Sequence, residues 1–429
     1  MMTIRLSRSR IKEYLLAAVI ISSLSLRNFQ YLVYLVQIVF LITSVKKALN
    51  DSNKWYALTT MFFAAFSGVS VFWAKDSSVV PGTLVSLLQI SVICLVITCF
   101  LKSLDSIERV IDHIVIAAVV LIVNLLVFTS ADEWRSIIFY SNSAYVDVAS
   151  SAGRLGRSIG MHPNTFGGTV SICLLFVLYR LYGKRQWRYL FLTLILLFLL
   201  LLSKSRSSLI EMALGVLLFF VLVQRKTSKR LMRLMMAVLI GLGALWAVMN
   251  VPVLYNLVGY RLEGVIRMLT GGKADASAST RMEFIQIGLD IFSDYPLAGV
   301  GLNNFSVVAY QDYGTYAQVY AHNTLVEILA DLGLVGFISY YSIRAYCLFR
   351  LWRLYHRFRY LCSVRQWNLL AFVLMLSCLL MVMDMSHMTY ITESYQYAHI
   401  IVITATFVLT HGLKARAAAL RIHAKEAED

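Results

Sequence analysis

The sequence predicts an all-α, polytopic integral membrane protein with about twelve transmembrane helices in a single membrane domain, 1–429. Of its 429 residues, 59% are apolar, 14% are charged and only four are proline, a composition that soluble domains do not have. Runs such as 111–128 and 189–203 carry almost no charge over about the 20 residues that a helix needs to cross a bilayer. On these terms we expect helices at 13–26, 30–45, 56–74, 82–101, 110–129, 166–182, 188–203, 208–224, 231–249, 323–348, 366–384 and 395–411.

The first two expected helices are short and are joined by Arg27, Asn28 and Phe29. They form a tight hairpin across the membrane, or one of them lies in the interface and the count falls to eleven. We expect the first helix to be retained. Arg5 to Lys12 and the apolar stretch after it resemble a signal sequence, but no small-residue cleavage site follows and another helix does.

The net charge of +16 raises the question of whether the protein binds nucleic acid. The basic residues lie in short turns between apolar helices, however, and not in a basic folded domain or on an aromatic platform, which excludes that class. They alternate from loop to loop, and basic loops mark the cytoplasmic side. We therefore expect both termini to be cytoplasmic. The six cysteines show no metal-ligand spacing, so neither disulfides nor a metal site is predicted.

Two outward loops, 130–165 and 251–322, are much longer than the others, and long loops are where function concentrates. In the larger loop, apolar residues recur on one face from Arg281 onward. Ser279 or Thr280 is the expected cap, so we predict an amphipathic helix that lies on the membrane.

That helix is expected to end at 294–296, where a glycine-rich turn, 299–305, follows. Glycine lets this backbone approach its neighbours closely. The turn has neither the lysine of a P-loop nor the strand of a dinucleotide fold, so it does not predict a nucleotide site.

Ionisable residues at the rim of membrane helices are candidates for function, because burying a charge there is costly unless it is paired or solvated. Lys204 and Arg206 form a two-cation turn between apolar helices, although a snorkelling interface arginine fits the same pattern. Arg281 would lie near the membrane surface. There, contact of its guanidinium with lipid headgroups is a simpler interpretation than catalysis. Arg157 adds charge to the same face, just before a helix that Asn164 is expected to cap. Together they predict an outward cavity rich in guanidinium groups.

His322 and Asn323 precede a long helix that carries Glu327 and Asp331 one turn apart on a shared face. A lone histidine there is usually a cap, but two carboxylates favour a polar site. Arginine binds phosphate bidentately. A neutral imidazole can take a proton from an attacking hydroxyl while arginines stabilise a departing pyrophosphate. These parts predict a group transferase with an anionic phosphate ligand.

The segment from His322-Asn323 through the glycines of 333–336 resembles the histidine and glycine motif of the O-antigen ligase and polymerase superfamily. The resemblance covers 160–345 by motif and the whole chain by helix count. Ile285 is one departure, because leucine is common four residues after the arginine of the second motif. Three further motifs are similar to the shared region of this family and follow its order, namely Ser205-Arg206 at a helix start, Arg281 heading a helix, and 295–301 before the histidine.

The resemblance implies a GT-C-like glycosyltransferase of the bacterial cytoplasmic (inner) membrane. It would transfer an undecaprenyl diphosphate-linked oligosaccharide, on the outer face, to an acceptor glycan or glycolipid. No cofactor, nucleotide sugar or metal is then needed. Carried over by position, Arg206 and Arg281 would bind the donor pyrophosphate, and Arg157 and Lys204 are further candidates for that site.

The same resemblance implies that His322 activates the acceptor hydroxyl and that Asn323 orients it. The supporting residues are then Glu327, Asp331, Gly333 and Gly336.

The acceptor distinguishes a polymerase from a ligase, and the motifs leave this choice open. The stretch HNTLVEILADLGLVGF (322–337) resembles capsule and exopolysaccharide polymerases, which favours the polymerase. A carrier of lipid-linked glycan or another anion is an alternative of a different class. It needs two related halves, yet loop 251–322 has no counterpart at 75–81. A scaffold would not need His322 with two arginines, and export or chain-length proteins are candidate partners.

Overall fold

The computed structural model describes residues 8–51, 53–139, 153–255, 259–260, 262–263, 266, 276–315 and 317–426. These residues form helices and their connections, without a β-strand, so the predicted all-α class is confirmed. Part of the smaller outer loop, 140–152, lies outside the described residues.

Each of the twelve expected spans coincides with a helix, although several helices are longer than predicted. Nine helices of the described chain are long and apolar enough to cross a membrane, and α8 is apolar but shorter. The polytopic membrane fold is thereby confirmed, while the number of crossings stays a prediction. The helices are α1 (Arg8–Ser25), α2 (Gln30–Asp51), α3 (Lys54–Val69), α4 (Val80–Thr98), α5 (Leu104–Phe128), α7 (Pro163–Lys184), α8 (Trp187–Leu202), α9 (Arg206–Leu222), α10 (Thr227–Asn250), α15 (Thr324–Arg357), α16 (Val364–Met383) and α17 (Glu393–Glu426).

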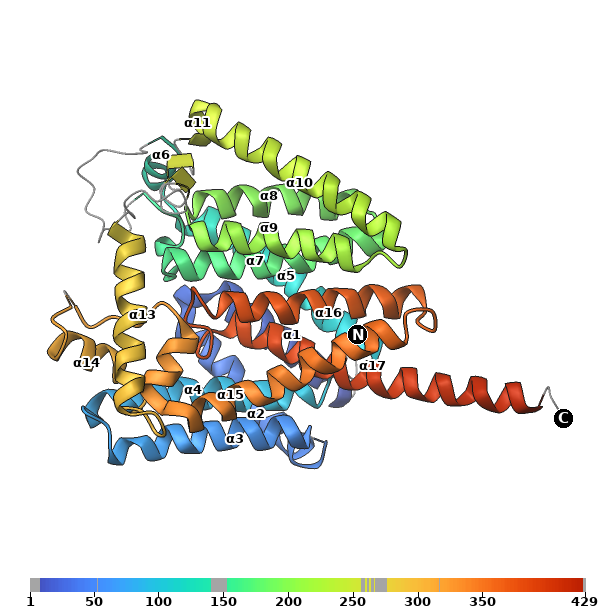
Figure 1. Cartoon of the computed structure of the whole chain (residues 1–429), viewed down its shortest axis with the longest axis horizontal. Helices are drawn as coiled ribbons and strands as arrows, with labels where there is room; N and C mark the ends of the chain where they lie inside the picture. The colour runs from blue at the N-terminus through green and yellow to red at the C-terminus, as the bar shows by residue number, and fades with distance from the viewer. Residues whose placement is uncertain are drawn as a thin grey trace, which may run out of the picture.

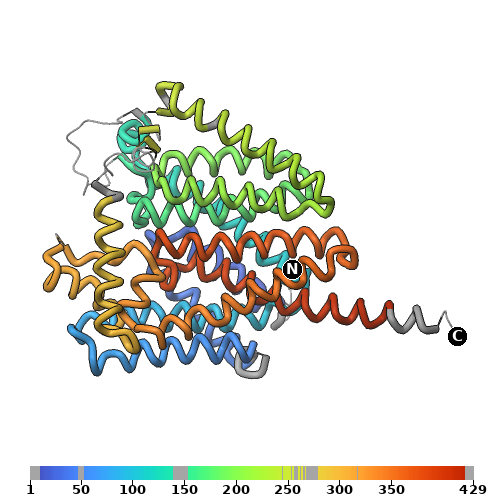
Figure 2. Tube along the Cα trace, viewed as in Figure 1, coloured from blue at the N-terminus to red at the C-terminus, as the bar shows by residue number. Residues whose placement is uncertain are grey.

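These helices lie side by side as a bundle, and α13 runs across one end of it (Figures 1 and 2). We call this the α13 end. At the opposite end, α17 extends beyond the other helices (Figure 1). The shorter helices at the α13 end are α6 (Ala131–Phe139), α11 (Pro252–Leu254), α13 (Ala276–Asp294) and α14 (Phe305–Gln311).

The helix α13 is amphipathic, as predicted. Phe284, Ile287 and Ile291 are buried and belong to one apolar cluster with Val300 and Phe305, so the glycine-rich turn and the start of α14 cover this face.

The predicted start of α13 was wrong. Ser279 and Thr280 do not cap it, because the helix is already formed at Ala276. Alanine has the highest helix propensity, and Ala276 and Ala278 extend the helix by more than a turn before Arg281. This arginine therefore lies inside the helix and not at its first position.

The long helix α15 is interrupted at Gly333, where φ is 60° and ψ is −161°. The four backbone groups that would form two helical hydrogen bonds across this break bond instead to the segment 296–301, so none of these four groups lacks a partner. The replacing bonds run from N–H to carbonyl oxygen, Val300 to Ala330 (3.0 Å), Gly301 to Asp331 (2.8 Å), Leu334 to Pro296 (2.9 Å) and Val335 to Leu297 (3.2 Å).

Glycine is required on both sides of this contact. A Cβ atom on Gly333 would collide with the backbone of Leu297, and one on Gly299 would collide with the backbone of Asp331. Both residues also have positive φ, which disfavours other side chains. The glycines of two separate predicted motifs thus form one backbone junction that docks the outer loop onto α15.

Candidate active site

The turn between α8 and α9 places Lys204 and Arg206 at the α13 end. The helix α8 ends at Leu202 and α9 begins at Arg206, while Lys204 has a φ of 50° and is buried. A Cβ atom on Gly167 of α7 would come within 2.9 Å of Ser203 Oγ. This glycine therefore lets the two-cation turn pack directly against the start of α7.

Arg154 joins this turn to the start of α7. Its Nε donates a hydrogen bond to the Ser203 carbonyl at 3.0 Å, and its terminal nitrogen donates to Asn164 Oδ1 at 2.6 Å. Asn164 was expected to cap α7, but the cap is His162, whose Nδ1 accepts a hydrogen bond from the Asn164 N–H at 3.3 Å. The amide side chain of Asn164 is thereby left to hold Arg154.

His322 lies immediately before α15, in a backbone conformation with φ 54° that non-glycine residues rarely adopt. Asn323 caps α15 and accepts a hydrogen bond from the Val326 N–H at 3.2 Å. The imidazole of His322 lies parallel to the ring of Phe284 on α13 at 6.2 Å between centroids, and it contacts Tyr320 at 4.1 Å. The amphipathic helix therefore forms one wall of the histidine site.

The imidazole of His322 is neutral over the physiological range. Burial lowers its pKa to about 3, and the nearby charges of Arg281, His162 and His387 act in the same direction. The pKa of His162 is also lowered, mainly by burial and then by the positive charges of Arg154, Arg157 and Arg281. A neutral imidazole keeps one nitrogen that can accept a proton. An anion bound among these cations would favour the protonated form. It would therefore raise the pKa of His322 towards the range in which an imidazole acts as a general base.

His387, which is buried, adjoins this cluster. Its Nε2 lies 3.1 Å from Glu211 Oε2, and Ser386 donates a hydrogen bond to the other oxygen of Glu211. Both members of the pair are almost fully buried. Glu211 lies on α9, just over one turn after Arg206, so this pair links the arginine helix to the loop between α16 and α17.

Thr324 connects His387 to His322. Its hydroxyl donates to the His387 carbonyl at 2.6 Å, and its N–H donates to the Asp384 carbonyl at 2.7 Å. The Thr389 N–H in turn donates to the Thr324 hydroxyl at 3.0 Å. The start of α15 is therefore held against the α16–α17 loop by three hydrogen bonds, two residues after His322.

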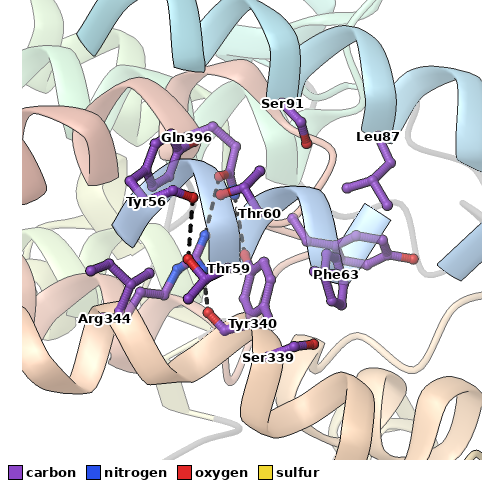
Figure 3. Close-up of a pocket in the computed structure, with 12 residues that line it drawn as sticks. Tyr56, Thr59, Thr60, Phe63, Leu87, Ser91, Ser339, Tyr340, Arg344 and Gln396 are labelled. Atoms are coloured by element: carbon purple, nitrogen blue, oxygen red, sulfur yellow. Dashed lines mark hydrogen bonds between the residues drawn. The ribbon is translucent and has the colours of Figure 1, made fainter. Parts of the chain in front are cut away.

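A polar region inside the bundle supports the same loop (Figure 3). Gln396 donates to the Thr389 carbonyl at 2.9 Å and to the Tyr340 hydroxyl at 3.1 Å, and it accepts from Arg344 at 3.2 Å. The adjoining cavity is about 20 Å³, which is room for about one water molecule. This region is too small for a glycan and instead buttresses the loop that carries His387.

The residues predicted from the sequence fall into two groups. Arg281 and Arg157 act electrostatically on the histidine cluster formed by His162, His322 and His387. Arg206 begins the helix whose Glu211 is paired with His387, and Lys204 lies in the turn just before it.

The predicted supporting residues Glu327 and Asp331 are almost fully buried. Both carboxylate oxygens of Asp331 accept backbone N–H groups, from Phe305 at 2.6 Å and Asn303 at 2.7 Å, and Glu327 accepts from Tyr390 at 3.3 Å. Together with Gly333, Asp331 shapes the scaffold of the outer loop. The second oxygen of Glu327 is buried without a hydrogen-bond partner among the described residues.

The His387–Glu211 pair was not among the residues predicted from the sequence. Glu211 is an acidic residue in an otherwise apolar span and already met the criterion for a functional candidate. His387 lies in a short polar interval, 384–389, between two apolar helices. Their pairing has no sequence signature, because they are 176 residues apart.

The fold and these side chains define a polytopic membrane protein with a cationic site, containing several imidazoles, at one end of its bundle. Residues 191–341 match the family described as O-antigen ligase, which confirms the resemblance to the O-antigen ligase and polymerase superfamily over this region. The match supports a function of the ligase or polymerase type. It includes Arg206, Arg281 and His322, and it ends before Asp384 and His387. A search of curated proteins finds no match to this chain.

Proposed function

We propose that this chain is a membrane glycosyltransferase that transfers an undecaprenyl diphosphate-linked glycan to a sugar hydroxyl. The observation that carries the proposal is the neutral imidazole of His322 beside Arg281, inside a region of the O-antigen ligase family. A base next to guanidinium groups suits a reaction in which a hydroxyl loses a proton while a diphosphate gains charge.

In the proposed reaction, the acceptor oxygen attacks the anomeric carbon of the donor glycan. A new carbon–oxygen bond forms, the bond from that carbon to the diphosphate breaks, and the diphosphate leaves with the electron pair. His322 takes the hydroxyl proton. Arg281 and Arg206 hold the donor diphosphate, with Lys204 and Arg157 adding positive charge, so that compensation for the developing charge is in place before the reaction.

We further propose that the α13 end faces the outside of the cytoplasmic membrane and that both termini are cytoplasmic. The turns at the opposite end support this orientation, because they are rich in cations and basic loops stay in the cytoplasm. They include Lys184 and Arg185, Arg225 and Lys226, and Arg357 and Arg359.

Polymerase is the preferred form of the activity, on the resemblance of 322–337 to capsule and exopolysaccharide polymerases. Ligation to a lipid A core is the second candidate, and the description of the matching family favours it. The two differ only in the acceptor.

Purified protein supplied with lipid-linked repeat units alone tests the proposal. Chain lengthening identifies a polymerase, whereas transfer that requires added lipid A core identifies a ligase. Donor binding without product under both conditions would contradict the transferase and favour a carrier of lipid-linked glycan.

A further inference from the structure

The last turns of α15 and the extended part of α17 lie at the end of the bundle opposite the α13 end (Figure 1). Residues of these two segments line a cavity. Its volume is about 570 Å³, which lies within the usual range for ligand pockets, about 300–1,000 Å³. We call it the basic cavity, because four of the residues that line it are cations, namely Arg350, Arg353, Arg357 and Lys414.

Among the described residues that line the basic cavity, none is acidic. In the described part of the chain, none of its four cations has a carboxylate within 4 Å. The Nε of Arg350 is also buried without a hydrogen-bond partner there. The charge of the cavity is therefore not compensated by the neighbouring side chains.

Some other cations at this end of the bundle are paired with carboxylates. Arg180 pairs with Glu108 and with Asp112, and Arg365 pairs with Asp105 at 2.6 Å. Acidic residues of α5 thus neutralise the arginines beside them, while the basic cavity is left cationic.

The walls of the basic cavity combine charge with apolar surface. The three arginines are three and four residues apart on α15, a spacing that places side chains on one helix face, and Lys414 faces them from α17. Leu354 and Phe358 line the same cavity and are buried. Such a site suits a ligand with an anionic head and a hydrocarbon body.

The aromatic residues around the cavity place it at the level of the membrane interface. Trp352 is 52% exposed, and exposed tryptophan is typical of the region where headgroups meet hydrocarbon. The guanidinium of Arg353 lies over the Phe349 ring at 5.1 Å. At this depth, the anion most abundant beside a cationic pocket is a lipid headgroup.

We infer that the basic cavity binds the phosphate headgroup of an anionic phospholipid, with the acyl chains against its apolar wall. The guanidinium groups supply charge-assisted hydrogen bonds to the phosphate oxygens, and Leu354 and Phe358 contact the hydrocarbon. The occupied site would tie α17 to α15, at the end of the bundle away from the histidine cluster.

Thermal unfolding of the full chain in detergent tests this inference without any assay of transfer. The additives are phosphatidylglycerol, phosphatidylcholine with the same chains, inorganic phosphate and polyglutamate. Phosphatidylglycerol should raise the unfolding midpoint of the unaltered protein more than phosphatidylcholine or phosphate does, because a ligand that binds only the folded state stabilises it.

Two triple variants with the same loss of charge separate the cavity from the rest of the basic surface. In the cavity variant, with Arg353→Gln, Arg357→Gln and Lys414→Gln, the shift caused by phosphatidylglycerol should fall to half or less. The control variant changes three cations outside the cavity and should keep the full shift. Its substitutions are Arg188→Gln, Lys226→Gln and Lys229→Gln.

Three results would overturn the inference. Equal shifts in both triple variants would mean that the lipid acts on the basic surface in general. An equal shift with inorganic phosphate would identify a free-anion site, and stabilisation by polyglutamate alone would identify an acidic protein segment. If the cavity variant does not fold, Lys414→Gln alone must reduce the amount of phosphatidylglycerol that native mass spectrometry detects on the purified protein.

Discussion

The Nε2 of His387 lies 3.1 Å from Oε2 of Glu211, which joins the loop after α16 to the helix that begins at Arg206. Glu211→Ala would leave a buried histidine without its partner. Leaving a buried polar group without its hydrogen-bond partner costs about 1–3 kcal/mol. We expect a loss on this scale in reversible unfolding, and a double variant with His387→Ala that loses clearly less than the sum of the single variants. Simple additivity would show that the two side chains do not interact.

The base proposed for the transfer is His322. His322→Ala should lower product formation by about 10²–10⁴-fold, the range for loss of a general base, while binding of the lipid-linked donor persists. The measurement is polymer or ligated product per unit time, beside a donor-binding assay. His411→Ala, an exposed histidine on α17, is the control and should keep normal product formation. Normal rates in both variants would remove the catalytic assignment.

Arg281 is proposed to hold the donor diphosphate. Arg281→Ala should weaken donor binding by about 10–100-fold, which is the effect of losing a hydrogen bond to a charged group of about 1.5–3 kcal/mol. Arg281→Lys should restore only part of the affinity, because lysine keeps the charge but not the bidentate geometry. Titration of the donor against each variant checks this, and Arg188→Ala at the opposite end should bind normally.

The lowered pKa of His322 predicts a stability that depends on pH. In the unfolded chain this imidazole takes up a proton near its ordinary pKa of 6.5, whereas in the folded chain it does so only near pH 3. Between these values the unfolded state binds more protons, so stability falls as pH falls from 6.5 towards 3. The unfolding midpoint of the unaltered protein should therefore drop between pH 7.5 and 5 by more than that of His322→Gln. Identical drops would contradict the buried, neutral imidazole.

Gly333 should tolerate no side chain. Gly333→Ala places a Cβ against the backbone of Leu297 at a φ of 60°, so we expect a loss of at least about 1–3 kcal/mol and release of the outer loop to added protease. Gly241→Ala is the matched control, because a Cβ there meets nothing within 4 Å and alanine favours a helix by about 1 kcal/mol. Equal stability of the two variants would be evidence against the junction.

The helices were predictable because a bilayer imposes a local requirement, about 20 apolar residues in a row. The start of α13 was missed by several residues, because Ser279 and Thr280 are as compatible with a helix interior as with a cap. Asn164 was also wrongly predicted to cap a helix. Its amide is taken by Arg154, a contact that local sequence rules do not anticipate.

The sequence by itself determined the membrane class, the amphipathic helix and the order of Arg206, Arg281 and His322, since each depends on short-range composition or on a local motif. Only the tertiary structure decided that Asp331 holds backbone N–H groups of the outer loop and that His387 meets Glu211. Both contacts join segments far apart in the chain, and their geometry follows from how the helices pack.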